Sequence, residues 1–200
     1  MTNNWKQTHN SPLAVRDGRR AVLKGAAALA LGMTATPSTS HGQDDAASAR
    51  PKPGDVLVKV GDSTLKPLTP EEIPVAAAPT MAWAMAPADK TVRSGSRLNR
   101  VLLVRIDIEQ LSAETKPMAA DGVVAYTAIC THSGCEITDW LPDEHVLYCS
   151  CHASKFDPKD GARVVDGPAP RNLPALPLGV TDGHLVVAGP FTSRVGFESP

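Results

Sequence analysis

All four cysteines of this 200-residue chain lie in one 22-residue window, within the stretch CTHSGCEITDWLPDEHVLYCSCHASKFD at residues 130–157. Two histidines are interleaved with them, and the arrangement falls into two groups. Each group holds one closely spaced Cys–His pair and one additional cysteine. Because thiolates and imidazoles are the usual protein ligands of zinc and iron, we expect the fold to gather these groups around a metal. The first group is Cys130-x-His132 with Cys135, and the second is Cys149-x-x-His152 with Cys151. Sixteen residues separate His132 from Cys149.

Both groups directly follow segments that are typical of β-strands. GVVAYTAI (residues 122–129) precedes the first group, and HVLYC (residues 145–149) leads into the second. β-Branched and aromatic residues are enriched in strands, and functional residues are commonly carried on loops that a rigid scaffold positions. We therefore predict two loops held side by side on a sheet.

The composition favours a fold of many short strands. The chain has 18 Pro and 15 Gly, and only 4% of its residues are aromatic. Further strands are predicted at residues 55–60, 100–108 and 184–189, and residues 109–120 are expected to hold one or two helical turns. The predicted fold class is therefore all-β and mainly antiparallel.

Residues 65–90 contain five prolines, which predict an extended and irregular segment rather than a helix. Within it, Met81, Trp83 and Met85 alternate along the chain. We interpret this alternation as one buried face of the extended segment.

Six candidate ligands allow more than one kind of metal centre. A structural zinc ion takes four ligands and would leave two of the six groups unused. An iron–sulfur centre with two thiolates and two imidazoles, together with two cysteines that close the loops on each other, would use all six. The other histidines are expected to be surface or strand residues; they are His9, His41, His145 and His184.

The pattern Cys130-x-His132, sixteen residues, Cys149-x-x-His152 resembles the ligand motif of Rieske iron–sulfur proteins. The resemblance implies one 2Fe-2S cluster per chain, with one iron on the two cysteines and the other on the two histidines. It also implies the Rieske fold, an antiparallel β-sheet base with a small cluster-binding subdomain of two loops, here at about residues 127–174.

Two further elements extend the resemblance. Cys135 and Cys151 are similar to the disulfide pair of Rieske proteins from cytochrome bc complexes, a pair that Rieske oxygenases and their ferredoxins usually lack. GPAPRNLP (residues 167–174) resembles the proline-rich loop that covers the cluster. Within that loop, the expected cover residues are Gly167, Pro168 and Pro170.

The resemblance also implies roles for two residues that follow the last histidine. In high-potential relatives, a Ser two residues after that His donates to a bridging sulfide, and a Tyr two residues further donates to a ligand sulfur. Ser154 retains the first hydroxyl, whereas Phe156 has none. Because each such bond stabilises the reduced cluster, we predict a positive reduction potential below that of relatives with both hydroxyls.

The N-terminus resembles a twin-arginine export signal. The arginine pair at residues 19–20 is followed by an apolar run that is too short for a membrane span. We predict a signal region at residues 1–42, a linker at 43–54 and a Rieske domain at 55–200. The protein is expected in the periplasm, and to be membrane-associated if the signal stays uncleaved.

Two positions are acceptable for signal cleavage, because small residues occupy both. They are Ser40-His41-Gly42 and Ala47-Ser48-Ala49. The sequence gives no reason to prefer one over the other.

The charge distribution excludes one class of partner. Residues 1–42 carry five basic residues and one acidic residue, so the rest of the chain has 15 basic against 20 acidic residues, a net charge of −5. A mildly acidic body gives no electrostatic basis for nucleic-acid binding. No Ser/His/Asp array or phosphate-binding loop favours catalysis by this chain alone, so no catalytic residue is predicted.

Three electron-transfer functions remain. The favoured one is the small subunit of a periplasmic oxidoreductase, similar to that of arsenite oxidase, which receives electrons from a large catalytic subunit. The second is the Rieske subunit of a cytochrome bc-type quinol oxidase, where a membrane cytochrome complex is the donor; Ser133 and Ala153 depart from the Leu and Gly usual there. The third is a free-standing Rieske ferredoxin. A c-type cytochrome or similar protein is the expected acceptor.

Overall fold

Short β-strands dominate the structure, a computed structural model that describes residues 41–197, with side chains from residue 45 onward. Within that part of the chain, α1 (His41–Ser48) is the one α-helix. Most of the predicted signal region, including the arginine pair, lies outside the described residues. Among residues 41–197, no helix reaches the length and apolarity that a membrane crossing requires.

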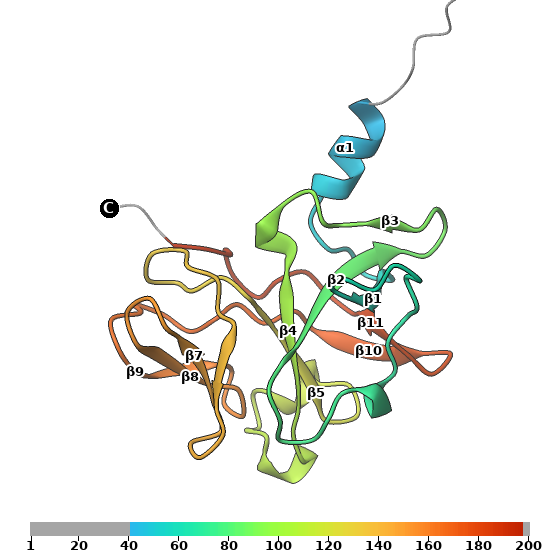
Figure 1. Cartoon of the computed structure of the whole chain (residues 1–200). Helices are drawn as coiled ribbons and strands as arrows, with labels where there is room; N and C mark the ends of the chain where they lie inside the picture. The colour runs from blue at the N-terminus through green and yellow to red at the C-terminus, as the bar shows by residue number, and fades with distance from the viewer. Residues whose placement is uncertain (1–40, 198–200) are drawn as a thin grey trace, which may run out of the picture. The chain divides into compact units, whose positions relative to one another are not determined.

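A seven-stranded antiparallel sheet forms the base of the domain (Figure 1). Its strand order is β10-β11-β1-β2-β4-β5, with β3 paired to β2. Strand β11 closes against β1, so the last strand of the sequence stabilises the first. The strands are β1 (Val56–Lys59), β2 (Thr80–Ala86), β3 (Thr91–Val92), β4 (Val101–Arg105), β5 (Val123–Thr127), β10 (Leu178–Thr181) and β11 (His184–Val187).

A second sheet of four strands, in the order β6-β7-β8-β9, forms the small subdomain, whose orange ribbons lie at the left of Figure 1. All of its pairings are antiparallel, and the chain enters it after β5. Its strands are β6 (Asp139–Leu141), β7 (Val146–Cys149), β8 (Ser154–Asp157) and β9 (Arg163–Asp166). The all-β prediction is therefore confirmed.

Within residues 41–197, four 3-10 turns connect the strands. Two of them lie in residues 109–120 or overlap that segment, as predicted from its sequence. The turns are η1 (Pro70–Glu72), η2 (Arg97–Asn99), η3 (Ile108–Gln110) and η4 (Lys116–Met118).

Strand β4 separates the two hydrophobic cores, because successive side chains of a strand point to opposite faces. Leu103 packs in the core on one face of the base, whereas Leu102 and Val104 pack in the core that the base shares with the small subdomain. Tyr126 belongs to this shared core, and its hydroxyl donates to the carbonyl of Pro158 at 2.8 Å. The small subdomain is thus fixed to the base by apolar packing and a buried hydrogen bond.

The segment with five prolines contains strand β2, and its predicted buried face is only partly correct. Ala82 and Ala84 have no exposed surface, whereas Met81 and Trp83 are half-buried. Because β2 lies between β1 and β4, small side chains fit the crowded face of this central strand. The guanidinium of Arg100 lies 4.7 Å from the ring centroid of Trp83, a cation–π contact that covers the other face.

Part of the segment predicted as a linker is helical and attached to the base. Arg93 donates to the carbonyl of Ala46 at 2.8 Å, and the amide of Gly95 donates to the carbonyl of Ala47 at 3.0 Å. Arg93 also forms a buried ion pair with Asp55, at 3.1 Å from Nε to Oδ2. Helix α1 therefore shares polar contacts with the segment that follows β3.

Candidate metal centre

The first Cys–His group forms a closed loop immediately after β5. The amide of Cys130 donates to the carbonyl of Cys135 at 2.8 Å, and the amide of Ile137 donates to the carbonyl of Ala128 at 2.7 Å. The amide of Gly134 donates back to the carbonyl of Cys130 at 3.1 Å. These bonds hold the loop in a fixed shape at the edge of the shared core.

The second group forms the turn between β7 and β8. Cys149 is the last residue of β7 and pairs in register with Ser154, the first residue of β8. The turn thus carries Cys151 and His152 at its exposed tip, while Cys149 stays buried beneath it.

A disulfide between Cys135 and Cys151 joins the two loops, as the resemblance implied. The bridged residues are 16 positions apart in the sequence. The sulfur of Cys149 lies within 4.8 Å of both bridged sulfurs. Because the bridged cysteines cannot act as thiolates, the thiols left for a metal are Cys130 and Cys149.

The four predicted ligands lie on these two joined loops. Cys130 and Cys149 are unpaired thiols, each with only 1% of its surface exposed. The rings of His132 and His152 face each other edge to face, with their centroids 4.6 Å apart. The Nδ1 atom of His132 is buried and has no hydrogen-bond partner among the described residues. A buried imidazole nitrogen without a partner, on joined loops that also bury two unpaired thiols, fits the donor set of a metal centre.

The surroundings of Cys130 explain why the site suits a bound cation. Burial, together with the nearby Cys149, raises the pKa of Cys130 to about 11. The backbone N–H of His132 and the hydroxyl of Ser154 act in the opposite direction, because hydrogen bonds from them favour the thiolate. Metal ligands must be deprotonated, so an iron at this position would supply the positive charge that the buried thiolate needs.

Ser154 is the first residue of β8 and contacts the cover loop. Its side chain has no exposed surface, and its hydroxyl oxygen accepts from the amide of Ala169 at 3.2 Å. Phe156 is also fully buried, in the core cluster that contains Cys130 and Cys149. Both side chains are therefore on the protein side of the two loops.

The predicted cover loop packs directly on the second group. Gly167 has a positive φ of 84°, and a Cβ atom there would lie 2.5 Å from the Cα of Ser154. Only glycine permits this approach of the two backbones. Pro168 and Pro170 are exposed on the outside of the loop, whereas Ala169 between them is buried.

Several residues that fix the site were not predicted from the sequence. The hydroxyl of Thr131 donates to the carbonyl of Arg171 at 2.6 Å and ties the first loop to the cover loop. Arg97 donates to the carbonyl of Gly134 at 2.7 Å. Phe197 contacts Gly134, since a Cβ added there would lie 2.8 Å from the ring. No local pattern marks these residues, because each contact joins segments at least 37 residues apart.

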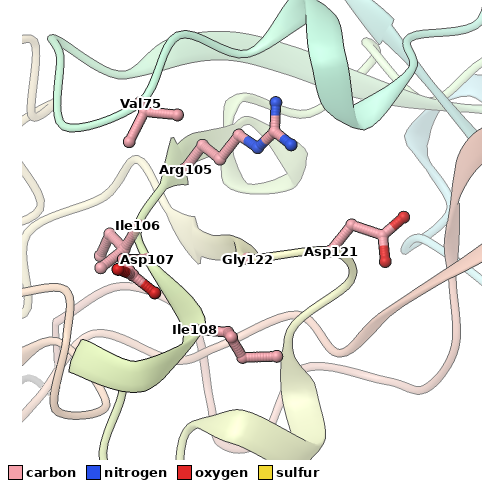
Figure 2. Close-up of a pocket in the computed structure, with 7 residues that line it drawn as sticks. All are labelled: Val75, Arg105, Ile106, Asp107, Ile108, Asp121 and Gly122. Carbon is pink, nitrogen blue, oxygen red and sulfur yellow. The ribbon is translucent and has the colours of Figure 1, made fainter.

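Figure 2 shows a separate hollow of about 450 Å³ at the opposite end of β4 and β5. Arg105 and Asp121 line it, together with Val75 and Ile108. None of the predicted site residues contributes to this hollow.

Two buried thiols and two facing imidazoles, on disulfide-linked loops of an antiparallel β domain, fit an iron–sulfur electron-transfer protein. The chain belongs to the Rieske family: residues 83–177 match the family described as "Rieske [2Fe-2S] domain". The domain binds a 2Fe-2S cluster and functions in electron transfer. The predicted family, fold and cofactor are thus confirmed.

Curated relatives place the family in respiratory complexes. The chain is 34% identical over 146 residues to a "cytochrome bc1 complex Rieske iron-sulfur subunit" of Streptomyces lividans, covering 72% of this chain and 85% of the relative. It is 42% identical over 107 residues to a "putative respiratory nitrate reductase subunit Rieske" of Haloferax mediterranei, covering 52% of this chain and 47% of the relative. A bc1 Rieske subunit of Streptomyces coelicolor is 34% identical, and the chain spans 41% of its length.

Solved structures are similar over part of the chain. The soluble domain of Rieske protein II from Sulfolobus acidocaldarius has a TM-score of 0.40 at 23% identity, covering 50% of this chain and 65% of that one. A Rieske protein from Synechocystis has a TM-score of 0.33 at 28% identity, covering 44% of this chain and 75% of that one. The family assignment depends on the sequence comparisons.

Proposed function

We propose that this protein carries single electrons in the periplasm as the small subunit of an oxidoreductase. In this proposal, Cys130 and Cys149 bind one iron of the cluster, and His132 and His152 bind the other. The supporting observation is that the two loops bury both unpaired thiols and set the imidazole rings against each other.

A bound 2Fe-2S cluster with this donor set supplies one-electron chemistry at roughly −150 to +300 mV, against about −400 mV for plant-type ferredoxins with cysteine ligands alone. Two neutral imidazoles in place of two thiolates leave less negative charge at the site, so an added electron is repelled less. His152 is exposed, whereas both thiols are buried. The imidazole side is therefore the side at which a partner would exchange the electron.

An EPR spectrum of dithionite-reduced protein, with parallel iron and sulfide analysis, tests the ligand assignment. We expect a rhombic signal of low average g and two irons per chain. His152→Ala should abolish that signal. The control His184→Ala, at a histidine on β11, should leave it unchanged. An EPR-silent wild-type protein that carries stoichiometric zinc would contradict the proposal.

The oxidoreductase subunit is supported by the nitrate reductase relative and by the polar tip of the first loop, where Ser133 is exposed. A second candidate is the Rieske subunit of a cytochrome bc-type complex, which the extensive match to the Streptomyces lividans protein favours. Co-purification of the native protein separates them. A large cofactor-bearing subunit supports the first function, and membrane cytochromes support the second. Purification alone would indicate a free-standing ferredoxin.

A further inference from the structure

An arginine-lined groove runs beside the first cluster loop. It consists of two adjoining hollows of about 380 and 230 Å³, which share Arg194 and Val195. Arg97 lines the first hollow and Arg50 lines the second. None of the residues lining either hollow is acidic, and the groove walls are apolar, formed by Leu98, Ile129, Val195, Phe197, Pro51 and Phe191.

The groove is directly connected to the metal centre. Arg97 donates to the carbonyl of Gly134, which lies two residues after His132. Phe197, at the end of the same hollow, packs on Gly134. A molecule bound in the groove would therefore contact the loop that carries one of the proposed histidine ligands.

The groove is positive in a domain that is otherwise acidic. Residues 43–200 have 15 basic and 20 acidic side chains, a net charge of −5. Arg50, Arg97 and Arg194 are all exposed, and among residues 45–197 none of the three forms an ion pair. Arginines without carboxylate partners create a local field that attracts and orients an oppositely charged surface.

We propose that the arginine groove binds an acidic segment of the redox partner protein, and so seats that partner against the first cluster loop. The proposal extends the electron-transfer function above. A protein segment fits better than a flat bilayer, because the site is concave and has apolar walls between its arginines. Aromatic and arginine residues are the side chains that dominate such contacts.

Arg194→Glu is the first test, because the Arg194 side chain makes no hydrogen bond within the described part of the chain. Arg105→Glu is the matched control, with the same charge change at the opposite end of β4 (Figure 2). The probe is fluorescein-labelled hexaglutamate, titrated with the cluster-loaded protein at low ionic strength and followed by fluorescence anisotropy. Glu198, outside the described residues, is kept in every variant so that its charge is common to all.

We expect saturable binding that weakens about fivefold in Arg194→Glu, remains in Arg105→Glu, and is lost in high salt. Arg97→Gln, which removes a charge without reversing it, should weaken binding less than Arg194→Glu. Equal weakening by Arg194→Glu and Arg105→Glu, or no saturable binding, would overturn the proposal. Binding of phosphatidylglycerol vesicles without binding of the peptide would replace it with a membrane-facing groove.

Small redox probes give a second measurement, which also separates the groove proposal from the proposed electron-transfer function. Ferricyanide, an anion, takes one electron from the reduced protein and becomes ferrocyanide; the cation tris(phenanthroline)cobalt(III) takes one electron and becomes cobalt(II). Arg194→Glu should slow electron transfer to ferricyanide roughly threefold and accelerate electron transfer to the cobalt complex. Unchanged rates with both probes would count against the groove. If EPR and iron analysis find no cluster, the proposed function is refuted, while the same hexaglutamate titration with the cluster-free protein still decides the groove.

Discussion

Phe156 occupies the position at which high-potential Rieske proteins are expected to carry a tyrosine. Its ring is fully buried in the core that also contains Cys130 and Cys149, and a phenylalanine offers no hydroxyl to a ligand sulfur. We expect Phe156→Tyr to raise the reduction potential by roughly 40 mV. This corresponds to about 1 kcal/mol for one hydrogen bond that is stronger in the reduced state.

Redox titration monitored by EPR measures this shift. Phe191→Tyr adds the same hydroxyl next to the other core, in the hollow of the arginine groove that no cluster-loop residue lines, and should leave the potential unchanged. A potential that stays constant or falls in Phe156→Tyr would show that this side chain does not tune the cluster.

Ala153 is a strained residue beside a proposed ligand. Its φ of 62° lies in the left-handed region, which costs a residue with a Cβ atom about 1 kcal/mol relative to glycine. Ala153→Gly should therefore increase the free energy of unfolding by about that amount, and thermal unfolding of the cluster-loaded protein measures it. Asp182→Gly removes similar strain in a distant turn, at a φ of 51°, and should give a comparable gain. A decrease in stability would show that the Ala153 methyl group makes a contact worth more than the strain.

The candidate ligands could be predicted from the sequence because each Cys–His pair is local, with only one or two residues between its members. The roles of Thr131 and Phe197 could not be predicted in this way. Their contacts join the first loop to residues that lie 40 and 63 positions away in the sequence. A threonine or a phenylalanine has many uses in a fold, and nothing in its neighbours indicates which distant backbone it will meet.

At the scale of elements, the disulfide is the covalent connection between two loops that belong to different sheets. Cys135 follows β5 of the base, and Cys151 lies between β7 and β8 of the small sheet. By the chain-entropy estimate, a closed loop of this size stabilises the fold by about 3 kcal/mol. Cys135→Ser should lower the free energy of unfolding by that amount and reduce the iron content of the purified protein.

Urea unfolding and iron analysis together measure the effect of this bridge. Ser150→Ala, an exposed change in the second loop, should alter neither quantity. Full iron content and unchanged stability in Cys135→Ser would contradict a role for the disulfide in holding the loops together.

The strong strands were predictable because they are buried on both faces and therefore apolar throughout. Strand β4 follows this pattern, with four of its five residues buried. Strand β9 has no fully buried residue and was not predicted, and β2 was obscured by the prolines on either side of it. Pairing with neighbours, rather than local preference, determines such strands.

At the scale of the whole molecule, the contacts of α1 bear on where the mature protein begins. Asn99 is fully buried and donates to the carbonyl of Ala49 at 2.8 Å, while Arg93 donates to the carbonyl of Ala46. Cleavage after Ala49 would remove the Ala46 acceptor and leave Arg93 without that bond, at a cost of about 1 to 3 kcal/mol. We therefore expect cleavage at Ser40-His41-Gly42 rather than at Ala47-Ser48-Ala49.

The intact mass of protein recovered from the periplasm measures this directly. The double variant Arg19→Lys, Arg20→Lys should remain in the cytoplasm with its full mass, because it lacks the paired arginines. A periplasmic protein that begins at Arg50 would show that the domain does not need the helix.

Two contacts from residues late in this sequence also bear on when the metal centre is complete. The side chain of Arg171 in the cover loop donates to the carbonyl of Gly196, and Phe197 lies against Gly134 of the first loop. The walls beside the first loop are therefore complete only once residue 197, which is 63 positions after Gly134, has been synthesised and packed. We expect cluster loading to follow this folding step. A translocation route that accepts folded proteins, which the paired arginines predict, suits this order of assembly.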